Sequence, residues 1–173
     1  MNAVGVLKSA FAGAHMWYQG TVADLTEEQA NIVPPGVAHP IGELTAHILH
    51  CEDVMINQVI WGKPPLWEQD GWKVKVGGDL MVDHPDAVAA RAYRCNLPAM
   101  LAYGEAVFAN TEAFLEGIED GDLDRELELV SLGFPSNMTV AVFLTQMLLG
   151  NTYAHTGEIS SLKGSLGKKG YAF

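Results

Sequence analysis

The chain has 173 residues, and its 21 acidic residues against 10 lysines and arginines give a formal net charge of −11. This balance argues against a nucleic-acid partner, because phosphate binding needs clustered basic side chains. A hydrophobic fraction of 49% with 18% charged residues is typical of a globular protein and not of a disordered chain. We therefore expect a single folded domain over residues 1–173.

The two cysteines, Cys51 and Cys95, are too few for a disulfide scaffold, so we expect both to be reduced, packed thiols. The segment from Met1 to Gly13 lacks the charged start and continuous apolar run of a signal peptide. No window approaches the ~18 consecutive apolar residues of a membrane-spanning helix. These features predict a cytoplasmic protein without a membrane partner.

The first predicted element is a helix that begins near Val4, because apolar residues then recur at steps of three and four. Its stripe contains Val4, Leu7, Phe11, Ala14, Tyr18, Val22 and Leu25. A capping-box pattern from Thr26 to Gln29 predicts a short extra turn. The Pro-Pro-Gly sequence at residues 34–36 ends that turn.

Pro40 marks the first turn of the second predicted helix, since its missing N–H would be unpaired at that position. The apolar stripe of this helix runs to about Trp61 and contains Ile41, Leu44, Ile48, Cys51, Met55 and Val59. Residues 62–85 are rich in proline and glycine, so we expect a long ordered loop there. The loop holds at most a short strand pair, indicated by the alternation of Trp72, Val74 and Val76.

The third predicted helix starts near Asp86 and runs towards Gly117. Pro98 lies inside this range and is expected to kink the helix, because it removes one backbone hydrogen bond. An acidic turn follows, and then a short strand over residues 127–132 is predicted.

The last predicted helix follows residues 134–137 and ends at Gly164 or Gly167. A narrow arc of its surface holds Leu144, Met147, Leu148, Asn151, His155, Ile159 and Leu162. Four long helices with one long connection predict an all-α fold, a four-helix bundle.

His155 lies at the centre of this apolar arc, so we expect its imidazole to point into the bundle. A buried imidazole needs partners for both ring nitrogens. It is interpreted either as a core histidine bonded to a polar neighbour or as a metal ligand. Asn151 lies one turn earlier on the same face, where it offers an amide oxygen, a weaker and harder metal ligand than imidazole.

On the second helix, Glu43, His47, His50 and Val54 form a row beside the apolar stripe, within about 60° of one another. The row is interpreted either as solvated surface or as a source of metal ligands. His50 is a candidate because an i, i+3 pair can converge on one ion. His15 on the first helix could reach the same interior.

These residues together resemble the DinB-like four-helix-bundle superfamily of metal-dependent proteins. The matching pieces, spread over most of the chain, are residues 25–30, 34–36, 41–48, 52–53, 65–68, 71–72, 155–159 and 162–164, with Gly167. The ending His-Thr-Gly-Glu-Ile at residues 155–159 is the most specific of them. The resemblance implies a bundle in up-down-down-up order, with the long ordered loop between helices 2 and 3, often as a homodimer.

The resemblance also implies a ligand set. The family places three histidines around a divalent metal, one from the second helix and two at i and i+4 on the last. His47 and His155 match two of these positions, and Asn151 stands at the third. Characterised relatives resemble thiol-dependent S-transferases, isomerases or hydrolases. In these a metal would lower the pKa of a bound low-molecular-weight thiol or water.

One hypothesis is therefore a site for nickel, zinc or manganese formed by His47 and His155, with Asn151 or His50 as the third ligand. An open position would accept water or the thiolate of a small-molecule substrate. The tryptophan-containing loop of residues 62–85 would roof the pocket. No catalytic residue is assigned.

The alternative hypothesis is a metal-free bundle with a degenerate site. In it Asn151 hydrogen-bonds to His155 or His47, because an amide can donate to one group and accept from another. Such a chain would serve as a small-ligand-binding or protein-interaction module.

Overall fold

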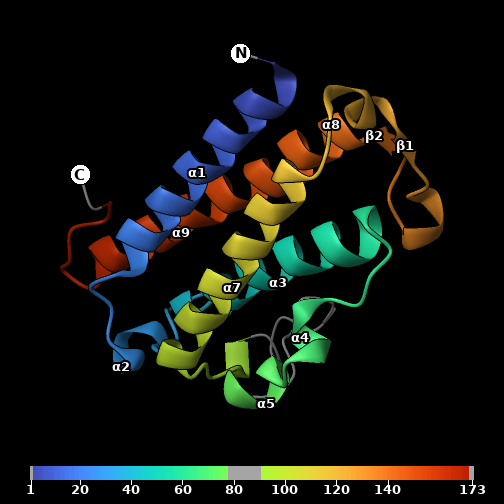
Figure 1. Cartoon of the computed structure of the whole chain (residues 1–173). Helices are drawn as coiled ribbons and strands as arrows, with labels where there is room; N and C mark the ends of the chain where they lie inside the picture. Colours follow the sequence, from blue (N-terminus) through green and yellow to red (C-terminus); the bar gives the residue numbers. More distant parts are fainter. Residues whose placement is uncertain (1, 78–90, 172–173) are drawn as a thin grey trace.

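The computed structural model describes residues 2–77 and 91–171, and the chain is mostly helical, as predicted. Figure 1 shows its long helical stretches. They are α1 (Ala3–Val22), α3 (Ile41–Asp53) continued by the π-helix η1 (Val54–Ile60), α7 (Leu97–Glu116), and the π-helix η4 (Phe143–Leu149) continued by α9 (Gly150–Ser165). The up-down-down-up order of a four-helix bundle stays a prediction.

Shorter elements connect these stretches. They are α2 (Glu27–Ala30), α4 (Leu66–Gln69), α5 (Trp72–Lys75), η2 (Asp120–Asp124), β1 (Glu126–Leu127), η3 (Val130–Leu132), β2 (Met138–Thr139) and α8 (Val140–Val142). The strands β1 and β2 pair antiparallel, with Glu126 opposite Thr139.

The N-terminal helices begin at residues that satisfy their free amides. Asn2 caps α1 by accepting from Gly5 N at 3.0 Å. The predicted capping box of α2 is confirmed, because Thr26 Oγ1 accepts from Gln29 N and Gln29 Oε1 accepts from Thr26 N. The predicted stripe of α1 is buried from Val4 to Val22.

Pro98 does not kink α7, and that prediction was wrong. The helix begins at Leu97, so Pro98 stands in its first turn, where a missing N–H breaks no helical bond. Asn96 caps it by accepting from Ala99 N at 3.2 Å. The predicted start near Asp86 lies outside the described residues.

The two predicted strand segments also differ from the structure. Trp72 to Val76 forms the helix α5 and its end, because an i, i+4 pair, Trp72 and Val76, fits one helical face as well as an alternating strand. In the range 127–132 only Leu127 is strand, since Asn137 Oδ1 accepts from Leu129 N at 2.9 Å and replaces a ladder partner.

Two apolar clusters make up the described core. One contains Tyr18, Ile48, Leu49, Met100, Tyr103, Val107 and Ile159. The other contains Phe11, Ile56, Phe114, Phe143, Leu144 and Leu148. Helix α1 packs along α9, and α3 packs against both α7 and α9 (Figure 1). None of the helices described is long and apolar enough to cross a membrane.

Adjacent buried carboxylates join α3 to its neighbours. Asp53 is fully buried and accepts four hydrogen bonds, from Asn57 Nδ2, Leu66 N, Trp67 N and Tyr103 Oη. This arrangement fixes the start of α4 against α3 and α7.

Glu52 is also buried, and its Oε1 lies 2.9 Å from His15 Nε2 and accepts from Thr111 Oγ1 at 2.7 Å. His15 stacks on Phe108 with the ring centroids 3.8 Å apart. His15 therefore has a structural partner inside the core.

Candidate functional site

The interface of α3 with α9 brings three of the predicted site residues together. His47 Nε2 lies 3.2 Å from Asn151 Oδ1. The rings of His47 and His155 meet edge to face, with centroids 4.7 Å apart. Two imidazoles and one amide oxygen, from two helices far apart in the sequence, thus share one location.

The sequence predicted that His155 would point into the core, but it does not. Its side chain is 28% exposed, and its Nδ1 is bonded to the carboxylate of Glu158. The buried residues of α9 are Thr152, Thr156, Ile159 and Lys163. The π-helix η4 explains the difference, because its wider winding changes the phase of the buried stripe before α9 begins.

His47 is held in a state suited to bind a cation. Burial lowers the pKa of His47 below its ordinary value, and the neighbouring His155 lowers it further, against an opposing effect of the Asn151 hydrogen bond. A histidine whose pKa is below about 6.5 is neutral at pH 7. One of its two ring nitrogens then carries a lone pair that can coordinate a cation, and no imidazolium has to lose a proton first.

Glu43 and His39 form a second titratable pair near His155. His39 Nδ1 lies 3.1 Å from Glu43 Oε2. Burial raises the pKa of Glu43, against the opposing charges of His39 and His155. The field around His155 therefore includes two carboxyl groups, Glu43 and Glu158.

His50 is placed differently from the other predicted ligands. Its ring packs against Trp67, with centroids 5.2 Å apart. Among the residues that the structure describes, no three His, Cys, Asp or Glu side chains are grouped so that they could hold a metal ion. Asn151 is the third predicted site residue that lies beside His47 and His155.

A cavity of about 550 Å³ lies beside this location. It is lined by His50, Cys51, Val54, Met55, Gln58, Val59, Glu128, Leu132 and Phe134. Cys51 connects it to the site, because its Sγ lies 3.7 Å from His47 Nε2. Four of the nine lining residues, Val54, Met55, Gln58 and Val59, come from η1, and π-helical segments often occur at functional sites.

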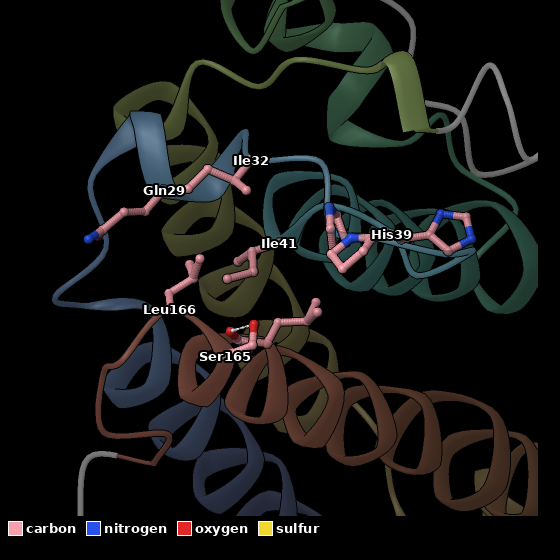
Figure 2. A pocket seen from close by; sticks show the side chains of 9 residues that line it. Gln29, Ile32, His39, Ile41, Ser165 and Leu166 are labelled. Atoms are coloured by element: carbon pink, nitrogen blue, oxygen red, sulfur yellow. Dashed lines mark hydrogen bonds between the residues drawn. The ribbon is translucent and has the colours of Figure 1, made fainter.

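Two further hollows lie where α9 meets the segment before α3. One, of about 200 Å³, is drawn in Figure 2, where Ile41 and Leu166 face the same space. Its lining consists of Gln29, Ile32, Pro34, Pro35, His39, Ile41, Leu162, Ser165 and Leu166. The other, of about 360 Å³, is lined by Val37, Ala38, His39, Leu44, Glu158, Ser161 and Leu162.

The donors at His47, Asn151 and His155 fit a divalent cation. The bond from His155 Nδ1 to Glu158 leaves Nε2 as the nitrogen with the free lone pair. A carboxylate behind a ligating histidine is the usual arrangement around protein-bound metals. Two imidazoles and an amide oxygen also leave coordination positions open.

Sequence reasoning missed two partners of the histidines. Glu158 follows His155 at i+3, and Cys51 follows His47 at i+4, so both spacings were visible in the sequence. The hollows carried no sequence signal, because they depend on how loops and π-helical turns pack.

Comparison with known proteins identifies a family and a similar fold. A model of the DinB superfamily matches residues 10–159. The crystal structure of a conserved protein from Enterococcus faecalis has a TM-score of 0.80 and 21% sequence identity, over 97% of this chain and 99% of that one. At this identity the similarity concerns the fold alone. No curated protein matches the chain.

Proposed function

The chain belongs to the DinB superfamily, and on that premise we propose that it binds a divalent metal ion through His47, Asn151 and His155 and acts on a small molecule. The observation that carries this proposal is the convergence of the three side chains, with His47 Nε2 at 3.2 Å from Asn151 Oδ1 and the two rings 4.7 Å apart. Membership also supports the predicted up-down-down-up four-helix bundle and the homodimer.

The chemistry of the donor set defines the kind of ion. A divalent ion supplies Lewis acidity, which lowers the pKa of a coordinated thiol or water. An amide oxygen in place of a third imidazole reduces the preference for zinc or nickel relative to a harder ion such as manganese. Glu158 orients His155 by accepting from its Nδ1.

The cavity beside Cys51 is the proposed place for the substrate. Its lining is mainly aliphatic and aromatic, with His50, Gln58 and Glu128 as polar groups. This composition is typical of small-molecule sites, where a few polar groups set orientation. A ligand there lies next to Cys51 and hence next to His47.

Metal titration tests the proposal. Chelator-treated protein is titrated with nickel, zinc and manganese by calorimetry, and we expect one equivalent of at least one of them to bind. His47→Ala and His155→Ala are each expected to weaken binding about tenfold or more. His50→Ala is the matched control, since it removes a histidine of the same helix that packs on Trp67. Absence of stoichiometric binding by all three ions would remove the proposal.

A second function has its own supporting observation. The hydrogen bond between His47 Nε2 and Asn151 Oδ1 gives each of these side chains a partner without a cation. This favours a metal-free ligand-binding module. Asn151→His separates the two functions: a module that has lost its metal gains a tight site only in the variant, whereas a working site binds metal in the wild type as well.

A further inference from the structure

The two hollows beside the end of α9 adjoin each other, because His39 and Leu162 line both. We call this pair of hollows the His39 groove. It begins between α2 and the end of α9 and reaches Glu158, the residue bonded to His155. It is separate from the cavity beside Cys51, which has a different set of lining residues.

The far end of the His39 groove is apolar and held in shape. Ile32 faces it from the segment after α2, Ile41 from the first residue of α3, and Leu166 from the residue that follows α9 (Figure 2). Arg91 holds the wall, since its guanidinium donates to the carbonyl oxygens of Pro34 and Gly36. A wall fixed in this way does not have to be ordered when a ligand binds.

The rim of the groove exposes more apolar surface. Val37, which lines one hollow, is 86% exposed, and Ile32, which lines the other, is 41% exposed. A ligand's hydrocarbon part would cover such exposed apolar side chains.

The other end of the groove is acidic. Glu158 lines it, and Glu43 lies directly behind His39, at 3.1 Å from the ring. The charged and titratable groups that act on Glu43 are His39, His155 and Glu158. No lysine or arginine is among the described residues that line the groove.

We propose that the His39 groove binds a small amphiphilic amine, with its apolar group against Ile41 and Leu166 and its ammonium at Glu158. The ammonium donates to the Glu158 carboxylate, and Glu43 adds to the negative potential at that end. The ligand class follows from the two ends, since an alcohol gains only the apolar contacts and a carboxylic acid is repelled.

Three probes of equal length test the class of ligand: hexylamine, hexanol and hexanoate. Each is titrated into chelator-treated protein and followed by NMR, so that the result does not depend on a metal ion. We expect hexylamine to bind about threefold or more tightly than hexanol, the ratio typical of a partly exposed ion pair, and hexanoate to bind least.

Variants locate the binding. Glu158→Gln and Glu43→Gln are expected to reduce the affinity for hexylamine and to leave that for hexanol unchanged. Glu128→Gln is the matched control, because Glu128 lines the separate cavity and its loss changes the net charge equally. Leu166→Ser should weaken both ligands, and Ile32→Ser, at an already exposed position, replaces it if that variant does not fold.

Three results would overturn the proposal. Hexylamine could bind no better than hexanol, hexanoate could bind best, or Glu128→Gln could reduce amine binding as much as Glu158→Gln does. The last result would indicate general attraction to an acidic protein. Loss of the metal site leaves these results unaffected, so the two proposals fail separately.

Discussion

Replacing Asp53 by asparagine tests how the carboxylate of α3 holds the neighbouring elements. Asp53 Oδ1 accepts from Asn57 Nδ2 at 2.7 Å and from Leu66 N at 2.9 Å. Its Oδ2 accepts from Trp67 N at 2.9 Å and from Tyr103 Oη at 2.6 Å. The change is nearly isosteric, so it alters hydrogen bonding with little change in packing.

The expected cost follows from the number of donors left without a partner. An amide nitrogen at either oxygen position turns an acceptor into a donor, and two of the four donors then have no acceptor. A hydrogen bond to a charged group contributes about 1.5–3 kcal/mol, so two lost bonds reduce the free energy of unfolding by about 3–6 kcal/mol. This is a large part of the roughly 5–15 kcal/mol that stabilises a typical domain.

Urea denaturation measures the effect, with Tyr103→Phe as the control. That variant removes one donor and leaves the Asp53 carboxylate with three, so it should reduce the free energy of unfolding by about 1.5–3 kcal/mol. Both variants should keep the wild-type dependence on urea concentration. If Asp53→Asn is no more destabilising than Tyr103→Phe, the reasoning from unsatisfied donors is wrong.

Three other predictions concern separate features of the structure. Hydrogen bonding to Lys163 holds the pKa of Asp24 below its ordinary value, so the carboxylate stabilises the fold above pH ~4 and stops doing so as the pH falls further. Asp24→Asn should therefore lower the free energy of unfolding, measured by urea titration, by about 0.5–1 kcal/mol at pH 7 and by less at pH 3. A cost that is equal at both pH values would contradict this. Gly42→Ala should destabilise the protein by about 1–3 kcal/mol, because the added Cβ would lie 2.5 Å from Cys95 Sγ. Gly164→Ala should stabilise it by about 0.5–1 kcal/mol, because a Cβ there meets no packed neighbour within 4 Å. If both variants shift the melting temperature in the same direction, this reasoning is wrong. Burial raises the pKa of Cys95 to about 11, so at pH 8 roughly one thousandth of this side chain is thiolate. Mass spectrometry after iodoacetamide treatment should therefore find Cys95 modified only in denatured protein.

The helices could be predicted because their signals are local. The stripe from Val4 to Val22 and the capping box at Thr26 each depend on residues within a few positions. Pro98 shows the limit of that reasoning. A proline is compatible with a helix interior and with a first turn, and the choice depends on where the preceding chain leaves the helix, which local spacing does not reveal.

The meeting of His47, Asn151 and His155 could be anticipated from spacing and family resemblance, but the orientation of His155 could not. The periodicity argument assumed one constant winding from Leu144 to His155. A π-helix changes the winding without changing the composition, so the half-exposed position of His155 and its bond to Glu158 were not visible beforehand.

The π-helix η4 has a consequence for how this site can change over evolution. An α-helix turns by about 100° per residue, so removing one residue from η4 would rotate all of α9 by about that angle relative to the core. Asn151 and His155 would leave α3 together, although neither had been substituted. Chain length within Phe143–Leu149 therefore controls whether Asn151 and His155 meet His47, and related chains that differ there by one residue will present a different face of α9 to His47.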